Sequence, residues 1–268
     1  MSQDTPRNPI TLKPLVYSTA DGDAVKPRRD VPFAGADGRE LLMDLYYPPT
    51  TTEGRRLPVV FIVEGFNDVG AERILGCRFK DMASVEGWGR LIAANGMVAI
   101  VCTNRNPLAD AHALLRHVRD NAAALGLDES RIGVWACSGH GPVALSVLIS
   151  DRRLTCAALV YPYLMDLDGS TAVAEAQKMW RFDNACEGRS IDELPADLPI
   201  FIVRAGKDQM PRLNEALDRF VAGSLAKNLP LSLVNYARGE HGFDLTNDSE
   251  GSREIIRNTL AFLRQWLA

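Results

Sequence analysis

Long apolar runs are missing from the sequence. The longest uncharged apolar stretches, residues 58–63 and 97–102, are far shorter than the ~20 residues that a membrane-spanning helix needs. The first thirty residues hold several prolines and charged side chains but no apolar core segment, so we expect no secretory signal there. These absences predict a cytoplasmic protein with no membrane partner.

The sequence also has few cysteines and no net positive charge. The five cysteines lie far apart, mostly within apolar stretches, and no C-x-x-C spacing occurs, which argues against a zinc site or a disulfide framework. We expect buried, reduced thiols instead. The formal net charge of −4, without a basic stripe, argues against a nucleic-acid partner.

The composition that remains is typical of a globular domain. Hydrophobic residues make up 46% of the chain and charged residues 24%, which excludes a disordered chain or a coiled coil. The 268 residues suffice for one large α/β domain, and no internal repeat or low-complexity linker divides them. We predict an N-terminal arm over residues 1–26 and a single domain over residues 27–268. The sequence leaves open whether the arm packs on its own sheet or on a neighbour, and what the oligomeric state is.

Strand-like and helix-like segments alternate through this domain. Residues 30–33 and 40–47 flank an Asp-Gly turn and predict a β-hairpin. Six short β-branched or apolar runs lie at residues 59–63, 97–102, 132–136, 156–161, 200–204 and 231–236. Runs that are apolar at every position suit strands covered on both faces. Apolar positions at helical spacing predict helices over residues 111–125, over 143–149, from Pro211 onward and over 255–267. The alternation predicts an α/β fold with a doubly wound, mostly parallel sheet flanked by helices.

Residues 165–195 fit this alternation poorly. The segment is rich in polar residues, holds one short helical piece at 171–180 and lies between two predicted strands. Ligands of an open parallel sheet bind beyond the carboxyl ends of its strands. We therefore predict that this insertion forms a small lid above the site.

The segment around Ser138 is the most informative part of the sequence. A predicted strand runs directly into small residues, then a serine, then a predicted helix, which is typical of a nucleophile on a sharp strand-to-helix turn. The match to the G-x-S-x-G pattern is incomplete, because Ala136 and His140 stand where the two glycines would be. Such a turn points the amide of Gly139 at a developing oxyanion, and the following helix N-terminus favours negative charge.

Two later turns supply the remaining groups of a hydrolase triad. Asp208 follows the predicted strand 200–204, and His241 follows the strand 231–236. The chain order serine, aspartate, histidine is the order that this architecture uses. We predict Ser138 as nucleophile, His241 as base and Asp208 as the acid that orients it.

These residues give the chain a family resemblance. From about residue 31 onward it resembles the α/β-hydrolase superfamily, and within it the dienelactone-hydrolase-like branch, through the Ser138 turn, Ala-Gly-Lys-Asp208-x-x-Pro, His241-Gly-Phe and Val-Glu-Gly-Phe66. The resemblance implies that the second oxyanion amide belongs to Phe66 or Gly65. It also implies a possible pocket role for Glu64. The dienelactone hydrolases carry a cysteine nucleophile where this chain has Ser138, and Cys137, one position earlier, should point elsewhere.

The predicted reaction is hydrolysis of a carboxylic ester, thioester or lactone through an acyl-enzyme, without metal or organic cofactor. Three alternatives stay open at this point. One is a small peptidase of the prolyl-oligopeptidase type, although nothing here could build the propeller domain of those enzymes. The others are a catalytically silent binding module with this fold, and acyl transfer to an acceptor other than water.

Each candidate residue also has an ordinary structural interpretation. Ser138 could cap the following helix, and Asp208 could cap the helix from Pro211, in which case Asp166 or Asp168 supplies the acid. His140 either donates into the site or merely occupies a position normally held by glycine. Tyr161 lines a substrate pocket or belongs to the core.

Overall fold

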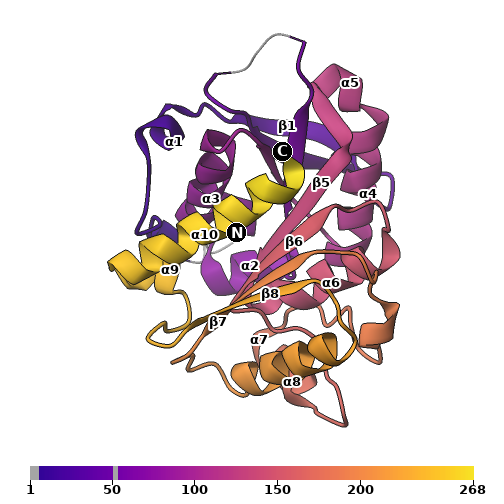
Figure 1. Cartoon of the computed structure of the whole chain (residues 1–268). Coiled ribbons are helices and arrows are strands. Elements are labelled where there is room, and N and C mark those ends of the chain that lie inside the picture. Colours follow the sequence, from indigo (N-terminus) through magenta and orange to yellow (C-terminus); the bar gives the residue numbers. More distant parts are fainter. Residues whose placement is uncertain (1–5, 51–53) are drawn as a thin grey trace.

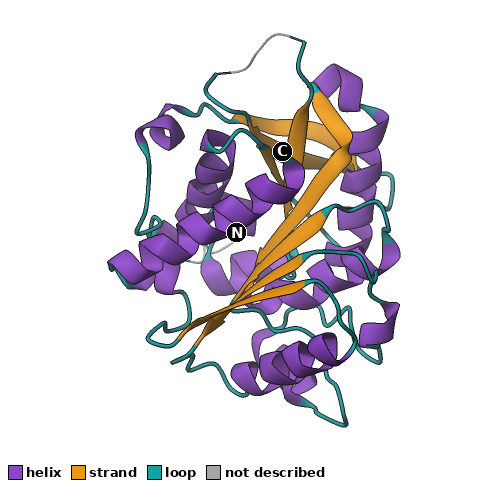
Figure 2. Cartoon of the chain, in the orientation of Figure 1, coloured by secondary structure: helices purple, strands orange, loops and turns teal. Residues whose placement is uncertain are grey.

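The computed structural model describes residues 6–50 and 54–268, and its centre is one eight-stranded sheet (Figures 1 and 2). The strand order is β1-β2-β4-β3-β5-β6-β7-β8. β1 (Arg28–Ala34), β2 (Glu40–Tyr46) and β4 (Val98–Cys102) pair antiparallel in succession. The other neighbours pair in parallel: β3 (Leu57–Ile62), β5 (Leu127–Cys137), β6 (Cys156–Val160), β7 (Ile200–Ala205) and β8 (Leu231–Tyr236). The predicted hairpin and the mostly parallel sheet are confirmed.

Helices cover both faces of the sheet, which explains why the central strands are apolar throughout. β3, β4 and β6 are buried at every position. One face packs against α3 (Ala83–Ala94) and α10 (Glu250–Leu267), and its core includes Trp88, Trp135 and Leu263. The opposite face packs against α4 (Pro107–Asp120), α6 (Gly141–Ser150) and α8 (Leu213–Ala226). Figure 2 shows the twisted sheet between these two helix layers.

The remaining helices are short and lie in the connections. They are η1 (Pro9–Leu12), α1 (Ala20–Ala24), α2 (Asp68–Leu75), η2 (Phe79–Asp81), α5 (Ala122–Leu125), η3 (Ser138–His140), α7 (Ala172–Trp180), η4 (Ile191–Glu193) and α9 (Phe243–Thr246). None of the helices in the described part of the chain is long and apolar enough to cross a membrane.

Several predicted helix boundaries were wrong; α10, for example, begins at Glu250 and not at residue 255. Two of the differences have a clear backbone cause. The helix expected over residues 111–125 is interrupted at Asn121, which separates α4 from the single turn α5. The helix expected from Pro211 begins at Leu213, because Arg212 takes a left-handed conformation with φ 55° that a helix cannot contain. Both differences arise from backbone conformations that apolar spacing does not encode.

The N-terminal arm folds back on its own domain. Residues 1–5 of the predicted arm lie outside the described residues, and the rest of it contains η1 and α1. The Arg90 side chain on α3 donates to the carbonyls of Gly22 and Val25. At the other end of the arm, Asn8 N donates to Leu75 O over 2.9 Å. The arm therefore packs against α3 and the end of α2.

Residues 165–195 form α7, the short helix η4 and the loops around them. Asp166 accepts hydrogen bonds from the amides of Val173 and Ala174 and so caps α7. Further along, Asp183 N donates to Gly65 O over 2.6 Å, which ties the segment to the loop that follows β3. The insertion thus reaches the carboxyl ends of the strands, where the candidate site lies.

Candidate active site

Ser138 lies on a tight turn between β5 and α6. Its φ is 51°, a left-handed value that is uncommon for a residue with a side chain and that marks strain at functional turns. Glycine at position 141 permits this turn, because the neighbouring chain comes very close there. A Cβ on Gly141 would collide with the Tyr163 carbonyl. The strand, the strained serine and the helix reproduce the predicted turn despite the incomplete G-x-S-x-G pattern.

The three predicted triad residues meet in one chain of hydrogen bonds. Ser138 Oγ lies 2.8 Å from His241 Nε2, and His241 Nδ1 lies 2.8 Å from Asp208 Oδ2. The Asp208 side chain is fully buried, whereas the His241 side chain keeps 17% of its surface exposed. Asp208 also accepts a hydrogen bond from Met210 N, and Asp166 is occupied with capping α7. Of the aspartates considered from the sequence, the structure brings Asp208 to the histidine.

The loop after β3 lies against the serine turn. A Cβ on Gly65 would collide with the Gly139 carbonyl, so glycine permits this close approach. Gly65 N donates to His140 Nδ1 over 2.7 Å, and the His140 ring lies between Phe79 and Phe66, with centroid distances of 4.1 and 5.2 Å. This contact holds the loop that carries Phe66 against the serine turn.

Burial fixes the charge state of His140. The side chain is almost entirely enclosed, and desolvation lowers its pKa to about 3. Since Nδ1 accepts the hydrogen bond from Gly65, the network assigns the ring proton to Nε2. His140 therefore acts as a neutral acceptor toward the loop.

Glu64 lies behind the same loop. Asn104 Nδ2 donates to Glu64 Oε2 and also to Phe66 O, the latter over 3.1 Å, and Asn104 N donates to Asp68 Oδ2 over 2.9 Å. Burial, reinforced by the nearby Asp68, raises the pKa of Glu64 well above its usual range. Burial likewise raises the pKa of Asp68 to about 6. The described residues that line the two cavities at Ser138 do not include Glu64 or Gly65.

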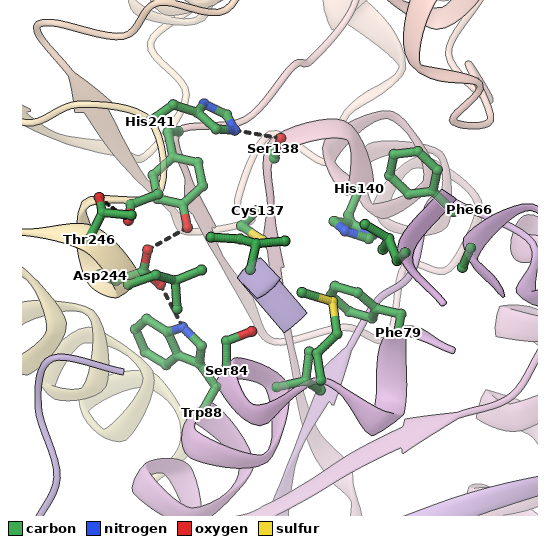
Figure 3. A pocket seen from close by; sticks show the side chains of 18 of the residues that line it. Phe66, Phe79, Ser84, Trp88, Cys137, Ser138, His140, His241, Asp244 and Thr246 are labelled. Carbon is green, nitrogen blue, oxygen red and sulfur yellow. Dashed lines mark hydrogen bonds between the residues drawn. The ribbon is translucent and has the colours of Figure 1, made fainter. Parts of the chain in front are cut away.

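Two cavities open beside Ser138. The large cavity has a volume of about 310 Å³ and is mostly aromatic and aliphatic; Leu75, Phe79, Trp88, Trp135, Tyr161 and His140 line it. Figure 3 shows Ser138 and His241 at the top of this cavity and Trp88 at the bottom. The small cavity, of about 110 Å³, lies between Ser138, Gly139, Tyr163, Trp180, Phe182 and Met210. Phe66 borders both.

Cys137 also faces the large cavity (Figure 3). Burial raises the pKa of its thiol, which disfavours the reactive thiolate. Of the adjacent pair Cys137 and Ser138, only the serine is hydrogen-bonded to His241.

A buried polar network that sequence analysis missed supports the histidine loop. Asp244 accepts hydrogen bonds from Tyr161 Oη over 2.6 Å and from Trp88 Nε1 over 3.0 Å (Figure 3). The Tyr161 ring lies 4.8 Å from the His241 ring. Trp88 and Tyr161 lie far from Asp244 in the sequence, so no local spacing connects them. Burial raises the pKa of Asp244.

The wall contributed by the N-terminal arm was missed as well. Ile10 of η1 lines the large cavity. Besides the bond from Asn8 to Leu75, Arg7 donates to the Asp81 carbonyl over 2.6 Å and fastens this part of the arm. A short segment far from the triad in sequence gives no signal of such a role.

Comparison with known proteins supports the fold. No protein-family model and no curated protein matches the sequence. Among solved structures, a bacterial heroin esterase aligns with a TM-score of 0.71 at 19% identity, covering 94% of this chain and 87% of that one. A thermostable esterase from Pseudomonas putida ECU1011 aligns with 0.70 at 16% identity, covering 93% and 86%. A thermophilic carboxylesterase cloned from a metagenomic library aligns with 0.64 at 20% identity, covering 97% and 92%.

At these identities the likeness establishes the architecture and not the reaction. The neighbours do not single out the dienelactone-hydrolase branch, so that narrower expectation stays a prediction. The chain has the α/β-hydrolase fold.

Proposed function

We propose that this protein is a serine hydrolase that cleaves carboxylic esters through an acyl-enzyme. The observation that carries the proposal is the unbroken chain from Ser138 through His241 to Asp208, with both hydrogen bonds 2.8 Å long. It begins on a serine held at φ 51° beside two cavities. A strained serine, a partly exposed histidine and a fully buried aspartate form the constellation that acyl transfer requires.

The first half of the reaction acylates the serine. Ser138 Oγ attacks the ester carbonyl carbon while His241 Nε2 takes the hydroxyl proton, and Asp208 stabilises the resulting imidazolium. The tetrahedral intermediate then collapses: the bond to the alcohol oxygen breaks, and His241 returns the proton to that oxygen. The alcohol leaves, and Ser138 carries the acyl group.

The second half consumes one water. His241 takes a proton from the water as its oxygen attacks the acyl carbon, and the bond to Ser138 Oγ breaks. His241 then protonates Ser138, which restores the free enzyme and releases the carboxylic acid. A thioester or a lactone can follow the same route, with a thiol or the ring oxygen as leaving group.

The amides of Gly139 and Phe66 are the proposed oxyanion donors. Gly139 follows the nucleophile on the turn, and Phe66 lies on the loop that His140 and Asn104 hold against it. Each such donor contributes about 3 kcal/mol to the stability of the transition state. Placement in the dienelactone-hydrolase-like branch is a narrower proposal, and it rests only on the sequence motifs around Ser138, Asp208, His241 and Phe66.

Active-site labelling tests the proposal. Intact mass is measured after treatment with a fluorophosphonate, on the wild type, Ser138→Ala and Ser150→Ala, with hydrolysis of a short-chain p-nitrophenyl ester in parallel. Ser150 is a matched control, because its Oγ lies 3.1 Å from His112 Nε2 in a serine–histidine pair outside the candidate site. We expect one adduct and ester turnover, both lost in Ser138→Ala and kept in Ser150→Ala.

Absence of both the adduct and turnover in folded wild-type protein would refute the proposal and favour a silent binding module. An adduct that persists in Ser138→Ala would place the nucleophile elsewhere.

A further inference from the structure

The two cavities beside Ser138 differ in which reacting groups they reach. His241 lines the large cavity and is not among the described residues that line the small one. Gly139, a proposed oxyanion donor, lines the small cavity and not the large one. The two halves of a bound ester must extend from the carbonyl carbon at Ser138, so each cavity can take one half.

The position of His241 decides which half goes where. In the acylation step the leaving oxygen receives its proton from His241 Nε2, so the alcohol half must extend along the histidine. That direction leads into the large cavity (Figure 3). The acyl half then extends past Gly139 into the small cavity, toward Phe182 and Met210.

The volumes set the size of each half. An apolar cavity of about 150 Å³ in another protein holds a benzene molecule. The large cavity, with about 310 Å³, has room for a bicyclic aromatic group or a similarly bulky aliphatic group. The small cavity, with about 110 Å³, is smaller than that benzene site and suits an acyl chain of a few carbons.

The lining sets the polarity. The described residues that line the two cavities include no lysine or arginine. Asp244 is the one acidic residue among them, and hydrogen bonds from Tyr161 and Trp88 occupy one of its oxygens each. A carboxylate or phosphate on the substrate would therefore be buried without a partner, which is costly.

We propose that the substrates are uncharged esters that join a short acyl group to a bulky apolar or aromatic alcohol, with the alcohol half in the large cavity. This inference rests on the proposed function and deepens it. It also makes Ile10 a specificity-determining residue, because the N-terminal arm supplies this side chain to the wall of the alcohol cavity.

A pair of isomeric esters tests the assignment. In 2-naphthylmethyl acetate the naphthyl group lies on the alcohol half, and in methyl 2-naphthylacetate it lies on the acyl half. The two molecules have the same atoms and leaving alcohols of similar acidity, so intrinsic reactivity does not separate them. We expect kcat/KM to be on the order of a hundredfold higher for 2-naphthylmethyl acetate, since each half then fits its cavity.

Variants of the two cavities sharpen the test. Ile10→Trp narrows the large cavity, so we expect kcat/KM to fall about tenfold more for 2-naphthylmethyl acetate than for ethyl acetate. Leu12→Trp is the matched control, because Leu12 lies on the same short helix but is 57% exposed and outside the described lining. Trp180→Ala widens the small cavity at a partly exposed position. It should raise kcat/KM for 2-naphthylmethyl hexanoate relative to the acetate.

The outcomes separate this inference from the proposed function. Equal rates for the isomers, or a preference for methyl 2-naphthylacetate, would overturn the assignment of the cavities while the fluorophosphonate adduct at Ser138 remains. The adduct without turnover of either ester would overturn the substrate class. Loss of both the adduct and all ester turnover would overturn the proposed function itself.

Discussion

Two histidines lie beside Ser138, one on the loop after β8 and one on the turn after β5, and their surroundings are opposite. His241 has a buried carboxylate, Asp208, on one ring nitrogen and the serine on the other. His140 has a backbone amide on one ring nitrogen and two phenyl rings packed beside it, Phe79 tilted and Phe66 in an edge arrangement. The His241 side chain reaches solvent, whereas His140 is buried.

This difference determines what each imidazole can do. A positive charge on His241 would be stabilised by Asp208, so this ring can accept and return a proton during a reaction. A positive charge on His140 would be buried without a partner, and the pKa of about 3 keeps the ring neutral. His140 can hold a backbone segment in place, but it cannot serve as a base at neutral pH.

The largest effect is expected from removing the charge that supports His241. In Asp208→Asn the amide no longer stabilises the imidazolium and favours the wrong tautomer, so kcat for a p-nitrophenyl ester should fall on the order of 10⁴-fold. Steady-state kinetics with Asp166→Asn as control checks this, because Asp166 caps α7 instead. A loss of less than tenfold in Asp208→Asn would contradict the role assigned to Asp208.

A smaller loss is expected when His140 no longer accepts the Gly65 hydrogen bond. His140→Leu leaves that amide unsatisfied and frees the loop that carries Phe66 N, so kcat should fall about 10- to 100-fold with a smaller change in KM. In His140→Asn the side-chain oxygen can occupy the position of Nδ1 and should restore most of the activity. Equal losses in the two variants would show that the hydrogen bond is not what matters.

The same comparison predicts how stability depends on pH. The pKa of His140 is near 6.5 in the unfolded chain and near 3 in the folded one, so between these values the unfolded state binds one more proton. His140 therefore contributes a fall in the free energy of unfolding as the pH decreases from 6.5 toward 3. In His140→Asn this contribution is gone, and urea unfolding at pH 7 and pH 4.5 should show a smaller loss on acidification than in the wild type. An identical loss would mean that His140 is not buried and neutral.

The sequence pattern singles out the position of His241 and leaves the role of His140 open, for a physical reason. Ser138, Asp208 and His241 each follow an apolar strand, and parallel strands bring their carboxyl ends to one edge, so strand pattern alone indicates that the three can meet. The roles of His140, Asp244 and Ile10 depend on contacts with residues distant in the sequence, such as Gly65, Trp88 and Leu75. The central strands β3, β4 and β6 were predicted closely because burial on both faces leaves a continuous apolar run. The edge strand β8 is only partly covered, and polar residues interrupt its run. The left-handed conformation of Arg212 corresponds to no such pattern in the sequence.

The smallest effect on turnover is expected from replacing Glu64, which precedes the Gly65 amide that donates to His140. Asp208 is hydrogen-bonded to the ring of His241, whereas Glu64 accepts a hydrogen bond from Asn104. Glu64 Oε1 is buried without a hydrogen-bond partner among the described residues. Glu64→Gln should therefore change kcat by less than about threefold, because neutral His140 needs no counter-charge. Stability should respond more. Since burial raises the pKa of Glu64, this carboxyl group keeps its proton in the folded state above pH 4.5, and it contributes stability that is lost as the pH rises.

The amide introduced by Glu64→Gln has no proton to lose, so the variant should gain stability over the wild type with increasing pH, by about 1–3 kcal/mol at pH 8. Urea unfolding of both proteins at pH 5 and pH 8 measures the difference. A gain confined to high pH, together with unchanged kcat, would establish that a charge on Glu64 destabilises the fold and is not needed for turnover. A large drop in kcat would instead make Glu64 part of the reaction and remove the contrast between the two histidines.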